Sequence, residues 1–180
     1  MSTTSTRFER ATKSNGLLET LLDRWRGQCE TYNEDFDDYS PEHMKHALEI
    51  AAENPPDQRY GIYVLNDGGE FFGLSHFNRA QVKRTTGWTL RIHWTLMAPR
   101  FDFEEQSLED IAGVTADVLY AAIKVAETEL PCDHIKFHLS GIPDRRYLYG
   151  VATGLKIGRI FGDVEYSGNW LTLSDLNTGP

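Results

Sequence analysis

The sequence predicts an α/β protein in which a mixed β-sheet carries helices on both faces. Three observations lead to this prediction. Amphipathic helical patterns open the chain, strand-like segments with alternating or continuous apolar residues follow, and a long helical pattern separates the third of these strands from the fourth. A strand, a long helix and a second strand in succession form a parallel crossover, whereas hairpins pair antiparallel. The expected order of elements is ααβββαβαββ.

Two helices are expected in the N-terminal part of the chain. The first covers residues 15–32, because apolar residues recur there at helical spacing, at positions 17, 18, 21, 22 and 25. The second covers residues 40–54, with Ser40 as N-cap and Pro41 at the first helical position. Residues 1–14 are rich in Ser and Thr and are expected to form a flexible tail, which leaves residues 15–180 as a single domain.

After these helices, the spacing of apolar residues changes from a helical period to the alternation of strands. Residues 59–65 and 70–80 read as the two strands of a hairpin, joined by the tight turn "NDGG". Residues 88–97 alternate as a third strand, which places Arg91, His93 and Thr95 on the face opposite the apolar side chains. The later elements are a helix at 107–130, a strand at 134–141, a helix at 144–155, and a closing hairpin of strands 157–166 and 170–176.

The composition excludes several classes of protein. A net charge of −9 argues against binding to nucleic acid through phosphate contacts, which needs a basic surface. No apolar run approaches the roughly twenty residues of a membrane span, and the start has no apolar leader, so a cytoplasmic location is expected. Cys29 and Cys132 are expected to be free thiols.

Two stretches resemble the GNAT superfamily of acetyl-CoA-dependent N-acetyltransferases. "TLMAPRF" at residues 95–101 is similar to the end of the family's fourth strand, and "YLYGVATGLKIGRI" at 147–160 is similar to its last helix and the step into the next strand. The resemblance implies acetyl-CoA or another acyl-CoA as cofactor, held between splayed fourth and fifth strands. It implies that the pantetheine arm bonds to backbone groups of Leu96, Met97 and Ala98.

The helix entry departs from the family pattern. Family members carry a glycine-rich loop that cradles the pyrophosphate, whereas "FDFEEQSLEDIAG" at 101–113 is acidic and has no glycine before the helix. Arg100 and the helix start at Ser107 are the remaining candidates to hold a phosphate. Ser107 is also expected to cap the helix, with Asp110 three residues later. A second resemblance, to acyl-homoserine-lactone synthases, rests on "ETYNEDFDDY" at 30–39 and "VLNDGGEFFGLSHF" at 64–77.

Candidate catalytic residues follow from the chemistry of acyl transfer. His93 and His138 lie on the polar face of two predicted strands and could accept the proton of an amine, although both are also typical of half-buried sheet histidines. Tyr149 lies next to the position where the resemblance places a tyrosine that protonates the leaving thiolate. No short-spaced ligand pair supports a metal site.

Asp35, Asp37 and His76 are the candidates for binding the acceptor. The two carboxylates lie in an acidic stretch that could bind a cation or could be an exposed loop. Aromatic residues around this stretch could wall a pocket or pack in the core: Trp25, Tyr32, Phe36 and Tyr39.

The leading hypothesis is therefore an acyl-CoA-dependent N-acyltransferase of divergent GNAT type. Its expected partners are a small-molecule amine or a protein acceptor, with no nucleic acid and no membrane, and it could act alone or as a homodimer. Two alternatives stay open. One is a catalytically inactive GNAT-fold protein that binds or scaffolds, and the other is an enzyme like the lactone synthases.

Overall fold

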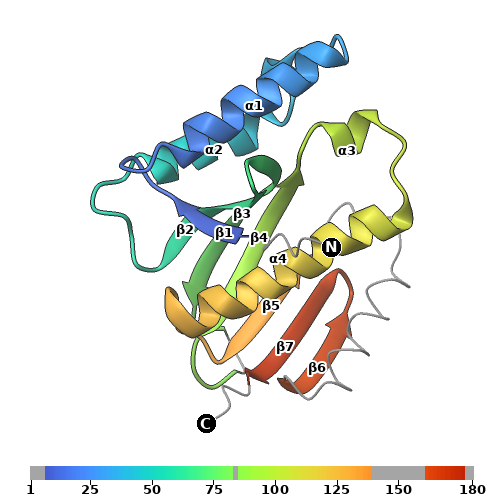
Figure 1. Ribbon diagram of the computed structural model, residues 1–180. Coiled ribbons are helices and arrows are strands. Elements are labelled where there is room, and N and C mark those ends of the chain that lie inside the picture. Colours follow the sequence, from blue (N-terminus) through green and yellow to red (C-terminus); the bar gives the residue numbers. More distant parts are fainter. Residues whose placement is uncertain (1–6, 83–84, 139–160, 177–180) are drawn as a thin grey trace. The chain divides into compact units, whose positions relative to one another are not determined.

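A computed structural model describes residues 7–82, 85–138 and 161–176, and its strands form one seven-stranded sheet in the order β1-β2-β3-β4-β5-β7-β6 (Figure 1). The strands are β1 (Arg7–Ala11), β2 (Tyr60–Asp67), β3 (Glu70–Ala80), β4 (Thr89–Met97), β5 (His134–His138), β6 (Phe161–Ser167) and β7 (Trp170–Leu176). The helices are α1 (Leu17–Thr31), the short 3-10 helix η1 (Phe36–Asp38), α2 (Pro41–Ala51), α3 (Arg100–Phe103) and α4 (Leu108–Thr128). The predicted mixed α/β class is confirmed.

The chain forms two compact units. The first comprises Met1–His76 and Thr95–Asp117, and the second comprises Phe77–Trp94 and Val118–Pro180. Among the described residues, no helix is long and apolar enough to cross a membrane. Cys29 and Cys132 are both free thiols, as expected.

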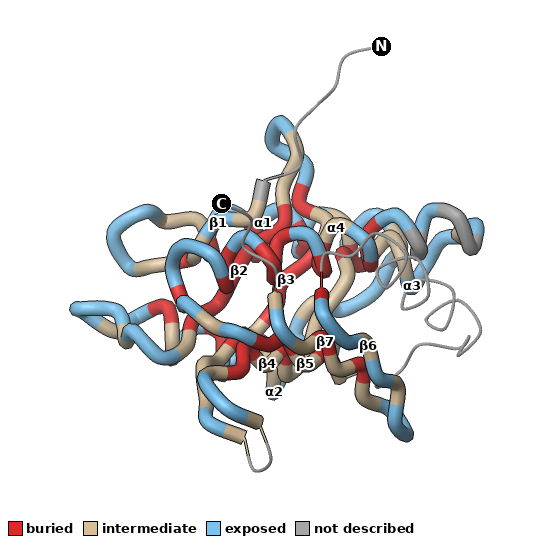
Figure 2. The backbone as a smooth tube through the Cα atoms, turned by 90° about the horizontal axis from the view of Figure 1, so that it is seen from below, coloured by how far each residue is buried: buried red, intermediate tan, exposed pale blue. Residues whose placement is uncertain are grey.

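The first unit is built on β1, β2 and the start of β3. Burial concentrates on β2 and the following strand, whereas the turn between them is exposed (Figure 2). That turn contains Gly68 and Gly69, both with positive φ, as a tight hairpin requires. The helix α1 packs with buried Leu18, Leu21, Leu22, Trp25 and Cys29, and the Trp25 indole N–H donates to the Phe71 carbonyl at 3.2 Å. Trp25 is therefore a core residue.

The strand β1 corrects one sequence prediction. Residues 1–14 were expected to form a flexible tail, yet Arg7–Ala11 pairs antiparallel with β2, from Arg7 opposite Asn66 to Ala11 opposite Ile62. The prediction is wrong for these five residues. A segment with two arginines and a glutamate shows no strong alternation, and the strand forms because β2 offers an edge to pair with.

The second unit contains the crossover that the sequence predicts. β4 pairs parallel with β5, from Thr89 opposite His134 to Ile92 opposite Phe137. β5 in turn pairs antiparallel with β7, which forms a hairpin with β6. The predicted helix at 144–155 falls on residues 139–160, outside the described part of the chain, and so does the stretch after β5 that was expected to splay from β4.

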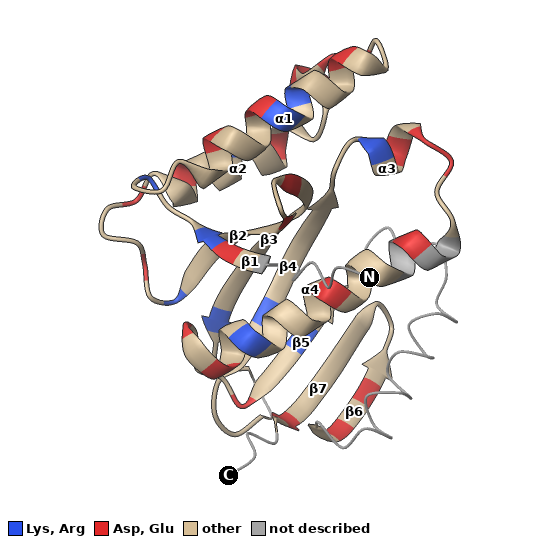
Figure 3. Cartoon of the chain, in the orientation of Figure 1, with Lys and Arg blue, Asp and Glu red and all other residues tan. Residues whose placement is uncertain are grey.

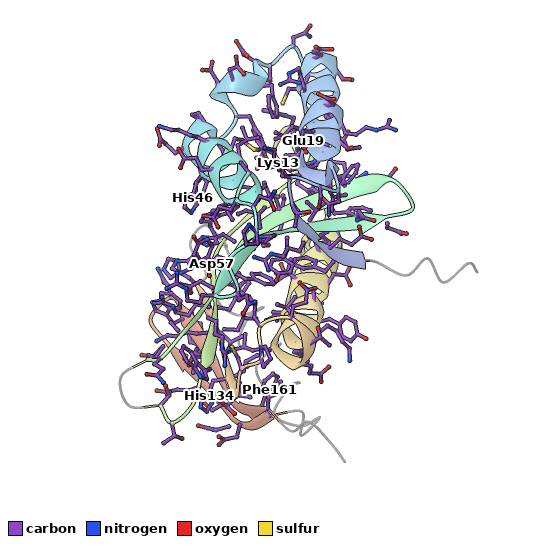
Figure 4. The ribbon with its side chains drawn as sticks, turned by 90° about the vertical axis from the view of Figure 1, so that its left-hand side faces the viewer. Lys13, Glu19, His46, Asp57, His134 and Phe161 are labelled. Atoms are coloured by element: carbon purple, nitrogen blue, oxygen red, sulfur yellow. The ribbon has the colours of Figure 1, made fainter. Side chains whose placement is uncertain are left out.

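His134, which is labelled in Figure 4, is buried and bonds two other segments of the second unit. Its Nε2 bonds the Thr86 carbonyl at 2.6 Å, and its Nδ1 accepts the Asp175 backbone N–H at 3.1 Å. Because Nδ1 accepts, the proton is on Nε2, so this ring is a neutral structural bridge.

Candidate functional site

The end of β4 presents backbone groups in two directions. The Ala98 N–H donates to the Phe72 carbonyl at 2.9 Å. The Leu96 carbonyl also lies toward β3, because a Cβ on Gly73 would be only 3.3 Å from it. Successive residues of a strand direct their backbone groups to opposite edges. Of the three predicted pantetheine contacts, Met97 is therefore the one whose N–H and C=O point away from β3.

Tyr39 holds that carbonyl. Its hydroxyl donates to the Met97 oxygen at 2.6 Å, from the segment that connects η1 with α2. Burial, together with the nearby carboxylate of Asp102, raises the pKa of Tyr39 far above its usual value. The hydroxyl is therefore protonated at neutral pH and acts as a donor.

Aromatic contacts hold the residues on either side of η1 against α3. The ring of Phe103 lies 5.4 Å from the ring of Tyr32 and 6.3 Å from that of Tyr39. The Tyr32 hydroxyl also donates to a Glu104 carboxylate oxygen. Trp25 meets Tyr39 edge-on at 6.2 Å, which connects this cluster to the core of the first unit.

Arg100 lies beside the end of β4, but its guanidinium and its backbone N–H already have partners within the chain. Its guanidinium bonds Glu70 at 3.3 Å and lies over Phe72 at 4.9 Å, and its backbone N–H donates to the Gln28 side chain at 3.4 Å. It borders a hollow of about 430 Å³ between α1 and the β2–β3 turn. The Glu70 carboxylate is largely exposed, so the ion pair is weak and an anion could compete with it.

Ser107 and Asp110 form the capping box that the sequence predicts. The Asp110 N–H donates to the Ser107 hydroxyl oxygen at 3.1 Å, and the Ser107 N–H donates to the Asp110 carboxylate at 3.3 Å. These bonds satisfy groups at the N-terminus of α4 that a phosphate would otherwise bind. The exposed carboxylates of Glu104 and Glu105 precede the helix, so the entry is acidic (Figure 3).

His93 and His138 come together in the second unit. Ile92 and Phe137 are partners in the β4–β5 register, and the two histidines directly follow them. Both histidines are half-buried and lie on the same face of the two strands. The His138 ring packs against Trp170, with centroids 4.5 Å apart.

No protein-family model matches the chain, and no curated protein sequence matches it. Among solved structures, a probable acetyltransferase aligns with 90% of this chain and 94% of its own, at 17% identity and a TM-score of 0.50. The chain has the fold of the GNAT acetyltransferases. Aminoglycoside 6'-acetyltransferase type Ii aligns with 93% of this chain and 96% of its own, at 16% identity and a TM-score of 0.49. A GNAT family acetyltransferase from Elizabethkingia anophelis with acetyl-CoA bound aligns with 94% and 97%, at 13% identity and a TM-score of 0.47.

Within this GNAT fold, the predicted acceptor residues have separate surroundings. The Asp35 carboxylate accepts the Asp37 backbone N–H at 2.9 Å and so caps η1, whereas Asp37 itself is exposed. The His76 ring meets the rings of His46 and Tyr60 at 4.9 and 6.4 Å. The structure therefore gives Asp35 a local backbone role and does not group it with His76. Tyr149 lies outside the described residues.

The bond from Tyr39 to Met97 is what sequence reasoning missed. The sequence marks the aromatic residues around the acidic stretch as candidates for a pocket wall, but nothing in the spacing of Tyr39 indicates a partner 58 positions away. Among the described residues, no group of His, Cys, Asp or Glu side chains is arranged to hold a metal ion.

Proposed function

We propose that this protein is an N-acyltransferase that transfers an acyl group from acyl-CoA to an amine. The observation that carries the proposal is the end of β4, where the Met97 backbone groups face away from β3 in a chain with the GNAT fold. A thioester arm can pair with such an edge as an added strand does. The Met97 N–H would then be a donor toward the thioester carbonyl, whose oxygen becomes negative as the amine attacks.

The reaction needs few groups from the protein. The amine nitrogen attacks the thioester carbon, the C–N bond forms, and the C–S bond breaks to release CoA as its thiol. One proton leaves the nitrogen, and His93 or His138 is the proposed base because imidazole titrates near neutral pH. Tyr149 is the proposed donor to the leaving sulfur. The acceptor is a small-molecule amine or a protein amine.

The acidic residues before α4 disfavour the phosphates of acyl-CoA, so most of its binding energy would have to come from contacts at the end of β4. The nucleotide phosphates would meet Glu104 and Glu105, and the capping box occupies part of the α4 N-terminus. Affinity must therefore come mainly from the pantetheine arm and the acyl chain. The Met97 carbonyl keeps a second lone pair beside the Tyr39 bond, so it can accept from the arm as well.

A catalytically inactive binding protein is the second candidate. One specific observation favours it: the groups that could hold a cofactor phosphate are bonded within the chain, Arg100 to Glu70 and Ser107 to Asp110. Such a protein would keep the fold and bind no acyl-CoA.

Calorimetric titration with acetyl-CoA, a medium-chain acyl-CoA and free CoA separates the two candidates. An enzyme should bind at least one acyl-CoA in the micromolar range, about −8 kcal/mol. Met97→Pro removes the N–H while leaving the Ala98 bond in place, and Met97→Leu is its matched control. Binding that is lost in the proline variant and kept in the leucine variant supports the proposal. Absence of binding in the unmodified protein contradicts it.

A further inference from the structure

The hollow that Arg100 borders lies wholly within the first unit, between the C-terminal half of α1 and the β2–β3 turn. Its volume of about 430 Å³ is within the usual range of small-molecule sites. We refer to it as the Arg100 hollow. Neither the Met97 backbone nor the two candidate bases line it, so the proposed acyl-transfer step does not use it. Its lining includes Arg24, Gly27, Gln28, Glu70, Phe71 and Arg100.

Gly27 leaves part of this hollow open. It lies inside α1, where glycine is less favourable than alanine because its backbone loses more freedom on folding. A Cβ at Gly27 would meet no atom within 4 Å, so close packing does not require glycine at this position. The missing side chain instead provides space in the hollow that a ligand can occupy.

Arg100 presents an oriented guanidinium at the edge of the hollow. Its guanidinium carbon lies 4.9 Å from the ring centre of Phe72 and 5.2 Å from that of Phe101, and it bonds the Glu70 carboxylate at 3.3 Å. Glu70 is 67% exposed, so this ion pair is weak and can be shared with a ligand. A planar guanidinium held in this way is suited to bind a carboxylate through two N–H groups.

Two further side chains bring hydrogen-bond donors to the same space. The Gln28 amide oxygen accepts the Arg100 backbone N–H at 3.4 Å, which leaves the NH₂ group of that amide as a donor. Within the described part of the chain, no side chain or carbonyl bonds that NH₂ group or the guanidinium of Arg24. Donors from three residues therefore line one concave surface.

The charges of the lining select the kind of ligand. Arg24 and Arg100 are balanced by the carboxylates of Asp23 and Glu70, so the hollow has no net charge in a protein that carries −9. A simple anion would be repelled by the protein as a whole, and a simple cation by the two guanidiniums. A zwitterion carries no net charge and can meet groups of both signs.

We propose that the Arg100 hollow binds a free α-amino acid with an apolar side chain. The carboxylate of the amino acid bonds the guanidiniums of Arg24 and Arg100 and the NH₂ group of Gln28. Its ammonium lies against Glu70, and its side chain extends toward buried Phe71 and into the open space of the hollow. The binding is non-covalent, and it adds a second ligand to the protein beyond the proposed acyl transfer.

The test is a titration of the full chain with L-leucine in the absence of acyl-CoA. Matched ligands are 3-methylbutylamine, which lacks the carboxylate, and 4-methylpentanoate, which lacks the ammonium. We expect L-leucine to bind at least tenfold more tightly than either of them. No binding of L-leucine would overturn the proposal, and so would equal binding of either analogue.

Variants at Gly27 locate the ligand. Gly27→Leu fills the open space with a good helix former, so the variant should unfold at the same temperature or higher while its affinity for L-leucine falls at least tenfold. Gly27→Ala adds a single methyl group, and its affinity should change less than threefold. Unchanged affinity in the leucine variant would overturn the location.

A second pair of variants tests the charge. Arg24→Gln removes a guanidinium that lines the hollow, and Arg59→Gln removes an exposed arginine that does not line it, with the same change in net charge. We expect a several-fold loss of affinity in the first variant and a change below twofold in the second. Equal losses would overturn the location. Because no acyl-CoA is present, the result does not depend on the proposed function.

Discussion

At the scale of single residues, Tyr39 has the largest influence on the candidate site. Its hydroxyl bonds the Met97 carbonyl, and its ring packs against the rings of Trp25 and Phe103. Since burial and Asp102 raise its pKa, this donor is not lost at any pH near neutrality. The residue therefore orders the strand end whether or not a ligand is present.

Replacing Tyr39 by Phe should destabilise the protein by about 1 kcal/mol, because one partly buried hydrogen bond is lost while the ring is kept. Urea unfolding measures the change. The matched control is Tyr120→Phe, since Tyr120 is 61% exposed. Equal stability of the Tyr39 variant and the unmodified protein would show that the Met97 bond contributes nothing.

His134 should tolerate replacement poorly. His134→Leu leaves the Thr86 carbonyl and the Asp175 N–H without their partner, at an expected cost of about 2–4 kcal/mol. His138→Leu serves as the comparison, because His138 is half-buried and should lose less than half as much. Thermal unfolding of both variants measures the two losses of stability. A larger loss in the His138 variant would contradict the assignment of His134 as the structural bridge.

The thiols should react slowly with alkylating agents. Burial raises the pKa of Cys132 to about 11, and burial also raises the pKa of Cys29, which is fully buried. The thiolate is the reactive form, so iodoacetamide should label Cys132 slowly at pH 8 and faster up to about pH 11. Mass spectrometry after timed labelling gives the rates. Labelling at pH 8 as fast as in denaturant would refute this prediction.

At the scale of elements, the long patterns were predictable and the short ones were not. The helix predicted at 40–54 is observed as α2, and the strand predicted at 70–80 is observed as β3. A helical or strand period needs several turns or alternations before it stands out. β1, η1 and α3 contain only five, three and four residues, so their existence depends on tertiary partners.

The capping box at α4 allows a test at this scale. Ser107→Ala removes the oxygen that accepts the Asp110 N–H, and an exposed N-cap of this kind contributes about 1 kcal/mol. We expect that loss in urea unfolding. Ser14→Ala is a suitable control, because Ser14 precedes α1 and its hydroxyl only meets that of Thr12. If the two variants were equally stable, the box would not contribute to the stability of α4.

At the scale of the whole molecule, the fold was predictable because the chain keeps the order of helices and strands even where it lacks sequence motifs such as the glycine-rich loop. The chain keeps the order of helices and strands of the GNAT fold, and the solved structure of a probable acetyltransferase aligns with 90% of it at only 17% identity. The site was predictable in part. Alternation placed His93 on the polar face of its strand and the parallel register brings His138 beside it, whereas the partners of Met97 and Arg100 depend on contacts that no local pattern encodes.

The negative net charge of the protein determines how its affinity for acyl-CoA should depend on salt. The protein carries −9, the helix entry adds Glu104 and Glu105 locally, and Arg100 is paired with Glu70. Under the proposed function, the anionic acyl-CoA would approach a surface that repels it, and salt would screen this repulsion. We expect acyl-CoA affinity to rise about threefold between roughly 20 and 200 mM NaCl, the opposite of a site built on a basic phosphate cradle.

The control ligand is an acyl-pantetheine without phosphates, whose affinity should not change with salt because it carries no charge to repel. Glu104→Gln combined with Glu105→Gln should remove part of the salt effect and tighten binding at low salt. An affinity that falls with salt would show that cations bind the phosphates after all, and Arg100 would then be the first residue to substitute, because an anion can displace the exposed carboxylate of Glu70 from it.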